Sequence, residues 1–190
     1  MPRSAHLLGS GWDRLRGAIL SVVCGTHQFV GDRGRWWRER WAQQRKGEDC
    51  VLCGRSGIDE DEWGIRVFTG EAVDGFAWKT GLIAGYVVAI WNGVHVAEPT
   101  QLASAQAAAY WREVTRIGRA VESCFEPAKV NYLTLGNNVP HLHTHIVPRP
   151  WSGDPGPNRA LDFAYLDAPR QPEVQVRDAA RLLRERLAET

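Results

Sequence analysis

The sequence has no long apolar run, no regular cysteine framework and no internal repeat. A membrane-spanning helix needs about 18 consecutive apolar residues, so we expect no membrane span. The stretch at 18–24 follows Arg14 and Arg16 as the apolar part of a signal peptide would, but no cleavage site is evident. We therefore predict a cytoplasmic protein. Four cysteines without regular spacing also argue against a secreted protein held together by disulfides.

Charge is nearly balanced over the 190 residues, with a net value of +1, but it is unevenly distributed. Residues 1–47 hold nine Lys or Arg and three acids, whereas the remainder holds 14 basic and 19 acidic residues. We expect 1–47 to be a basic N-terminal extension that is partly disordered. The acidic balance of the remainder argues against nucleic acid as a partner.

Within the extension, residues 34–41 mix three arginines with three tryptophans. Such a segment could bind nucleic acid or an anionic membrane surface through charge and aromatic stacking. Trp37 and Trp41 are also spaced as neighbours on one helix face, and we favour a short helix whose tryptophans pack on the domain.

The most distinctive segment is 131–150, which reads NYLTLGNNVPHLHTHIVPRP. On a β-strand, alternate residues point to the same face, so His141, His143 and His145 would present three imidazoles together. Neighbouring histidines would lie about 7 Å apart, which is too far for all three to bind one zinc ion. A row of imidazoles suits a phosphate chain better, because at neutral pH imidazole can act as nucleophile, proton donor or hydrogen-bond donor.

A Gly-Asn-Asn turn precedes the histidines, and Pro-Arg follows them. Gly136 tolerates positive φ, and the turn offers anions its backbone N–H groups and the amide of Asn137.

The segment resembles the histidine triad (HIT) superfamily, whose signature is His-φ-His-φ-His-φ-φ with φ apolar, flanked by an upstream glycine and a downstream Pro-Arg. The chain departs from this pattern at Thr144, where φ is apolar, and at Asn137, where glutamine is common. The resemblance covers about residues 48–155 and implies a HIT domain there. A linker and a C-terminal helix are then expected over 156–190.

The resemblance also implies roles. His143 would be the nucleophile that attacks the α-phosphorus of a nucleotide to form a covalent nucleotidyl-histidine, and His145 would contact the α-phosphate and help the leaving group. Substrate contacts would come from Asn131, Gly136 and Asn137 as well as from His145. The expected protein is a homodimeric hydrolase.

Its substrate would be a dinucleoside polyphosphate or a nucleoside phosphoramidate, with adenine as the expected base. The third histidine stands where the uridylyltransferase branch carries glutamine, which favours hydrolysis over sugar-nucleotide transfer. The alternatives are a nucleotidyltransferase or phosphorylase of the same family, and a nucleotide-binding scaffold.

Cys50 and Cys53 form a CxxC pair with three interpretations: half of a zinc site, a redox pair, or coincidence. A redox pair should open a helix after a strand, and nothing in the sequence suggests that. A zinc site needs two further ligands, for which His95 and His141 are candidates. The resemblance favours structural zinc on these four residues, because one branch of the family combines CxxC, a mid-chain histidine and the first triad histidine.

Short strands are predicted where β-branched and aromatic residues gather between glycine-containing turns. They lie at 65–68, 76–79, 85–91 and 130–135, before the histidine strand. Apolar residues spaced by three and four predict a helix over 101–125, capped by Thr100, and a C-terminal helix over 176–188 that packs on the domain or on a second subunit. Strands joined by short turns and interrupted by one long helix predict an α+β, HIT-like domain with a mainly antiparallel sheet.

Overall fold

The computed structural model describes residues 32–81, 83–151, 160–161, 166 and 170–189. The chain divides into two compact units at Glu39 and Arg40, and helix α2 (Asp32–Gln44) runs across this boundary. The predicted helix in the Trp-Arg segment is therefore confirmed. Trp37 is 55% exposed, and the packing of the tryptophans on the domain stays a prediction. The apolar stretch at 18–24 lies outside the described residues, as does most of the extension that we expect to be partly disordered.

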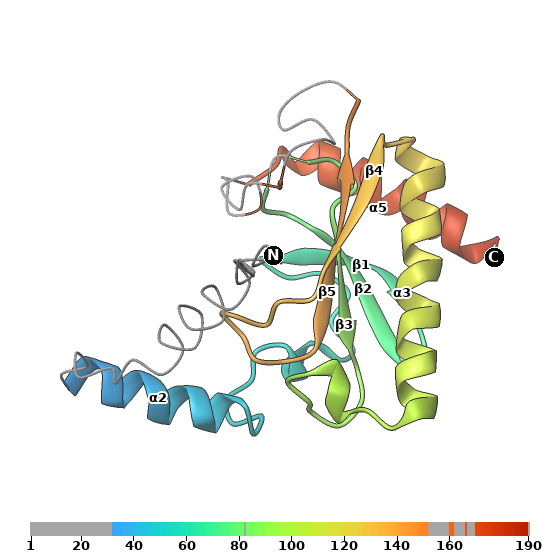
Figure 1. Ribbon diagram of the computed structural model, residues 1–190. Helices are drawn as coiled ribbons and strands as arrows, with labels where there is room; N and C mark the ends of the chain where they lie inside the picture. The colour runs from blue at the N-terminus through green and yellow to red at the C-terminus, as the bar shows by residue number, and fades with distance from the viewer. Residues whose placement is uncertain (1–31, 82, 152–159, 162–165, 167–169, 190) are drawn as a thin grey trace, which may run out of the picture. The chain divides into compact units, whose positions relative to one another are not determined.

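In the described part of the second unit, five strands form one antiparallel sheet in the order β1-β2-β3-β5-β4 (Figure 1). They are β1 (Gly64–Thr69), β2 (Val73–Trp78), β3 (Val87–Trp91), β4 (Lys129–Leu133) and β5 (His143–Arg149). The predicted α+β class with a mainly antiparallel sheet is confirmed.

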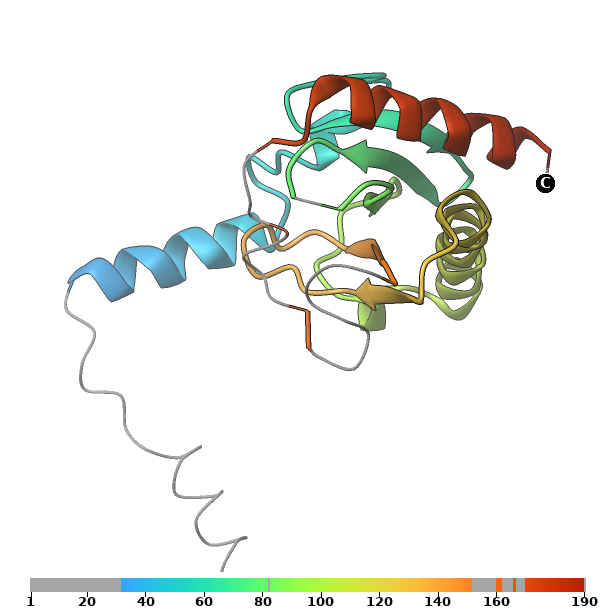
Figure 2. The ribbon, with the colours of Figure 1, turned by 90° about the horizontal axis from the view of Figure 1, so that it is seen from above.

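Helices α3 (Ser104–Phe125) and α5 (Glu173–Ala188) cover one face of this sheet (Figure 2). Val114 and Ile117 of α3 and Leu183 of α5 are fully buried in one core with the sheet. Complete burial of such a side chain stabilises a fold by about 1.5–3 kcal/mol. The C-terminal helix therefore packs on the domain itself. Among the helices of the described residues, none is long and apolar enough to cross a membrane.

Helix α3 begins later than predicted, and the prediction that Thr100 caps it is wrong. Thr100 lies in a separate 3-10 turn, η2 (Pro99–Gln101). The Gln101 side chain closes this turn by accepting hydrogen bonds from the backbone N–H groups of Ala97 and Glu98, at 2.7 and 2.8 Å. The helix ends at Phe125, before Pro127, as predicted.

The opposite face of the sheet, which we call the site face, carries a second apolar cluster. Because side chains alternate along a strand, Val88 and Ile90 of β3 lie on the site face with Phe76 of β2 and Val147 of β5. Leu166 is buried in the same cluster. The β5 residues that share a face with Val147 are His143, His145 and Arg149.

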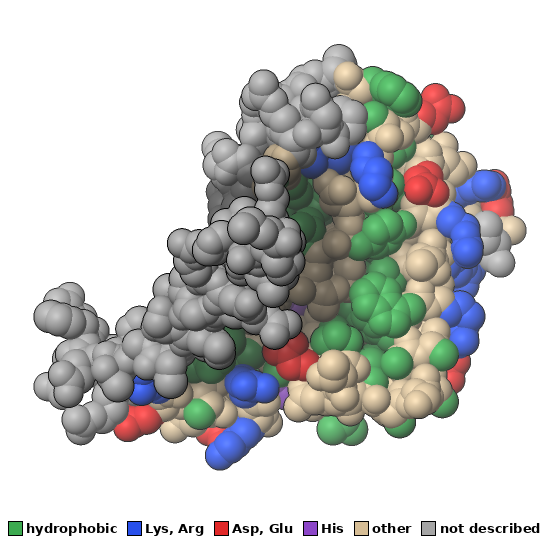
Figure 3. All heavy atoms as spheres, viewed as in Figure 1, with side chains coloured by type: hydrophobic (Ala, Val, Ile, Leu, Met, Phe, Trp, Pro, Cys, Tyr) green, Lys and Arg blue, Asp and Glu red, His purple; other side chains and the backbone are tan. Residues whose placement is uncertain are grey.

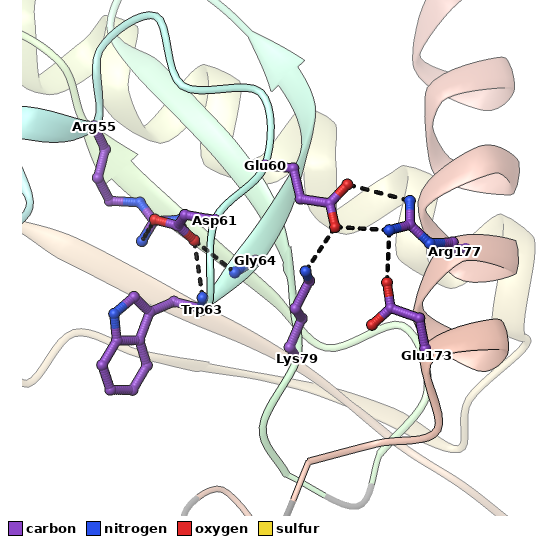
Figure 4. A network of polar contacts seen from close by, with 8 residues as sticks. All are labelled: Arg55, Glu60, Asp61, Trp63, Gly64, Lys79, Glu173 and Arg177. Carbon is purple, nitrogen blue, oxygen red and sulfur yellow. Dashed lines mark hydrogen bonds and ion pairs between the residues drawn. The ribbon is translucent and has the colours of Figure 1, made fainter.

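Two buried arginines tie the loop after the CxxC pair to the sheet. Arg66 of β1 pairs with Asp74 at 2.7 Å and donates to the backbone carbonyl of Arg55 at 2.8 Å. Arg55 in turn pairs with Asp61 at 2.6 Å, and the same carboxylate accepts the backbone N–H of Gly64 (Figure 4). The loop therefore has anchors of its own that do not depend on a metal ion.

Candidate functional site

Strand β5 lies between β3 and the edge strand β4, and alternate side chains of β5 lie on the site face. His143 is paired with Ile90 of β3, and His145 is paired with Val88. His141 lies just before β5 and is 1% exposed, whereas His143 is 9% exposed. Small patches of histidine side chain reach the surface in the view of Figure 3. The row of three histidines predicted from the sequence is therefore two histidines on the strand and a third, His141, whose side chain does not join them.

The His143 ring is fixed by its own strand. Its Nδ1 lies 2.6 Å from the backbone carbonyl oxygen of His141, and a carbonyl can only accept, so Nδ1 carries the hydrogen. Burial lowers the pKa of His143, and this hydrogen bond acts in the opposite direction without reversing the shift. The net lowering keeps the ring neutral at pH 7. A neutral imidazole with hydrogen on Nδ1 has a lone pair on Nε2, and that lone pair is a nucleophile.

His145 lies beside His143, with ring centroids 4.9 Å apart. Its Nδ1 is 2.5 Å from the hydroxyl of Tyr86, which stands just before β3 and is 2% exposed. Burial, with a smaller effect from His143, lowers the pKa of His145 to about 4. Both strand histidines are therefore neutral bases at pH 7.

His141 faces the CxxC pair. Its Nε2 donates to the carbonyl oxygen of Trp91 at 2.8 Å, which leaves a lone pair on Nδ1. That Nδ1 lies 3.5 Å from Cys50 Sγ, 3.4 Å from Cys53 Sγ and 3.3 Å from His95 Nδ1. The four ligand atoms all lie within 4.8 Å of one another. The structure thus brings together all four residues predicted to bind a metal.

These distances fit a tetrahedral ion. With Zn–N bonds of about 2.0–2.1 Å and Zn–S bonds of about 2.3 Å, tetrahedral geometry places nitrogen–nitrogen and nitrogen–sulfur pairs about 3.3–3.6 Å apart. The separations of 3.3 to 3.5 Å in the structure fall in this range. The cluster of Cys50, Cys53, His95 and His141 could therefore bind a metal ion.

Without a bound ion, the cluster holds protonated thiols beside a neutral imidazole. Partial burial, followed by the neighbouring Cys50 thiol, raises the pKa of Cys53 to about 11. Burial lowers the pKa of His141 to about 4, so its ring stays neutral and able to coordinate. A bound cation would lower the pKa of the thiols, because a thiol that coordinates a metal loses its proton.

Asn131 of β4 lies opposite Val147 and therefore on the site face, near the strand histidines. Arg149, which is 2% exposed, donates from Nη1 to Asn131 Oδ1 at 2.8 Å. The Asn131 amide is thereby oriented with its oxygen engaged. The sequence gives no signal for this role of Arg149 beyond its place in the Pro-Arg pair that follows the histidines.

The turn before the histidines has the predicted backbone. Gly136 has a φ of 65°, a conformation that favours glycine, and Asn137 is exposed. Thr144, the polar residue at an apolar signature position, points away from the site face. Its buried hydroxyl lies 2.7 Å from the hydroxyl of Tyr110 on α3 and 2.7 Å from that of Thr134.

Tyr86 was not among the predicted site residues. It lies 59 positions from His145 in the chain, and a tyrosine at a strand start is ordinary in a buried sheet. Nothing in the chain's own pattern distinguishes it, and only the register between β3 and β5 brings it to His145.

Comparison with known proteins agrees with this geometry. Residues 82–150 match the HIT domain. The chain is 30% identical over 112 residues to Protein hit of Bacillus subtilis (strain 168), an overlap of 56% of this chain and 75% of that protein. The fold is similar to a histidine triad protein from Bradyrhizobium japonicum, with 23% identity, a TM-score of 0.58 and coverage of 73% of this chain and 98% of that one.

A zinc-bound histidine triad family protein from Mycobacterium smegmatis has a similar fold too, with 24% identity, a TM-score of 0.56 and coverage of 74% and 94% of the two chains. The fold, the matched segment and the histidines on β5 agree with one another. This chain belongs to the HIT, or histidine triad, family.

Proposed function

We propose that this protein hydrolyses a dinucleoside polyphosphate or a nucleoside phosphoramidate, with adenine as the base, through a covalent nucleotidyl-histidine. The observation that carries this proposal is the hydrogen bond from His143 Nδ1 to the His141 carbonyl, at 2.6 Å. It leaves Nε2 of a neutral imidazole as a nucleophile beside a second, half-buried histidine. Membership of the HIT family supports nucleotide chemistry at this site.

In the first step, His143 Nε2 forms a bond to the α-phosphorus, and the bond from phosphorus to the leaving oxygen or nitrogen breaks. The leaving group keeps the electron pair, and His145 contacts the α-phosphate and assists its departure. The phosphorylated imidazole is cationic with hydrogen still on Nδ1, and the His141 carbonyl, 2.6 Å away, stabilises that charge.

In the second step, water attacks the same phosphorus and releases a proton to solvent, the bond to Nε2 breaks to restore the neutral imidazole, and the nucleoside monophosphate leaves. Covalent catalysis divides one difficult displacement into two easier ones. Substrate contacts are assigned to Asn131, whose amide Arg149 orients, and to Gly136 and Asn137 in the turn, with His145 on the phosphate.

We also assign zinc to the cluster of Cys50, Cys53, His95 and His141, supported by ligand separations of 3.3–3.5 Å. When bound, a structural zinc ion links the CxxC loop to His141 and so steadies the carbonyl that His143 uses. The resemblance further implies a cytoplasmic homodimer, and light scattering on the purified protein would measure its mass.

The test is release of AMP from diadenosine tetraphosphate and from an adenosine phosphoramidate. Wild type should turn over at least one of them, and His143→Ala should reduce turnover to background. Thr144→Ser is the matched control, because it alters the next residue on the opposite face and keeps the buried hydroxyl. It should retain activity.

Equal activity in wild type and His143→Ala would overturn the nucleophile assignment. Nucleotide binding without turnover of either substrate would overturn hydrolysis. Transfer to another acceptor, or a binding role, would then explain the site.

A further inference from the structure

Tyr86 is held rigidly next to the candidate site. Its backbone N–H donates to Ile83 at 3.3 Å, and its carbonyl accepts from Trp78 at 2.9 Å. The ring lies in the apolar cluster of the site face, and its centroid is 5.9 Å from that of His145. The hydroxyl therefore has a fixed position 2.5 Å from His145 Nδ1.

The direction of this hydrogen bond follows from the chemistry of the two groups. A phenol, with a pKa near 10, is a much stronger acid than the N–H of neutral imidazole, while an imidazole nitrogen with a lone pair is a good acceptor. The favoured arrangement is O–H donating to Nδ1. A neutral imidazole that accepts on Nδ1 must carry its hydrogen on Nε2.

The two strand histidines are thus oppositely arranged. His143 donates from Nδ1 to a carbonyl and has a bare Nε2, whereas His145 accepts on Nδ1 and has an N–H at Nε2. Attack on phosphorus needs a lone pair, and contact with a phosphate oxygen needs a donor. A lone pair on His145 Nε2 would instead repel that oxygen.

We infer that Tyr86 is a positioning residue that holds His145 in the Nε2–H tautomer, so that two adjacent, chemically identical side chains perform different tasks. The tautomer is a property of the folded protein alone. Its consequence for turnover rests on the proposed hydrolysis.

The first test is nuclear magnetic resonance of the metal-loaded wild-type protein labelled with 15N at histidine. Comparison with His145→Gln assigns the signals of His145. We expect its Nδ1 to be hydrogen-free and its Nε2 to carry hydrogen, with the reverse for His143. Hydrogen on Nδ1 of His145 in the wild type would overturn the inference, and this measurement depends neither on the folding of a Tyr86 variant nor on activity.

The second test is Tyr86→Phe, with Tyr110→Phe as its matched control. Both changes remove one buried phenolic hydroxyl, but Tyr110 bonds Thr144 on the other side of the sheet. Tyr86→Phe should give a mixture of His145 tautomers and lower kcat on the order of tenfold with little change in KM. The loss is smaller than the hundredfold or more that follows deletion of a donor outright, since part of the population keeps the active tautomer.

Tyr110→Phe should leave both the His145 signals and kcat unchanged. If Tyr86→Phe keeps the wild-type His145 signals, the inference is wrong. If the signals change while wild type hydrolyses neither nucleotide, the tautomer assignment stands and the proposed hydrolysis fails.

Discussion

The buried hydroxyl cluster behind β5 allows a quantitative test of how the strand is held. Tyr110 and Thr144 are both 0% exposed, and their hydroxyl oxygens are 2.7 Å apart. Thr134, which is exposed, bonds the same Thr144 hydroxyl at 2.7 Å. Thr144 occupies an apolar position of the HIT signature, so valine is the natural perturbation.

Thr144→Val keeps the side-chain shape but leaves the Tyr110 hydroxyl buried without its partner. Desolvation of an unpaired hydroxyl costs about 1–3 kcal/mol, and we expect the free energy of unfolding to fall by that amount. Tyr110→Phe should cost about 0.5–1.5 kcal/mol, because Thr144 keeps its bond to Thr134. The double variant leaves no buried hydroxyl here, so its cost should be less than the sum by about 1 kcal/mol.

Urea unfolding of the metal-loaded wild type and the three variants measures this coupling. Unchanged m-values would show that the denatured state is not the source of the differences. Costs that add within about 0.3–0.5 kcal/mol would refute the shared hydrogen bond.

Three further predictions concern an ion pair, pH and metal. Glu60→Ala should lower the free energy of unfolding by about 1–3 kcal/mol, because the buried Lys79 ammonium loses its partner at 2.7 Å. Arg177→Ala removes the exposed arm of the same network (Figure 4) and should cost less; equal losses in urea unfolding would contradict this. Acidification from pH 6.5 toward 4 should destabilise the fold, because burial lowers the pKa of His145 to about 4 and the unfolded chain takes up this proton first. This contribution changes by at most about 1.4 kcal/mol per pH unit and is fully present above pH 6.5. His145→Gln should therefore reduce the slope of the unfolding free energy against pH by the equivalent of about one proton. An unchanged slope would exclude His145 as its source. Chelation of zinc should lower the melting temperature of wild type, whereas Cys53→Ser, already short of one ligand, should respond much less; equal shifts would remove Cys53 from the metal site.

Local sequence pattern predicted much of the site. The alternation of His143 and His145 with Thr144 places the histidines on one face of a strand in any sheet, because side chains alternate with period two. The need for positive φ at Gly136 is equally local. The metal ligands came from the family resemblance, and their convergence is a tertiary fact that the structure provides.

The start of α3 shows where local reasoning failed. Thr100 is a good helix cap by residue type, yet the Gln101 side chain closes a separate turn ahead of the helix. The helix itself begins at Ser104, where the Gln106 side chain accepts the backbone N–H of Ala103 at 3.0 Å.

By itself, the sequence determined the α+β class, the strand that carries the histidines and the chemistry available to them. The tertiary structure alone decided which nitrogen of each ring is free. His141 meets the Trp91 carbonyl, His143 meets the carbonyl of His141, and His145 meets Tyr86. An imidazole can carry its hydrogen on either nitrogen, and its hydrogen-bond partner selects one of them: a carbonyl of its own segment for His143, and groups brought by other strands for His141 and His145.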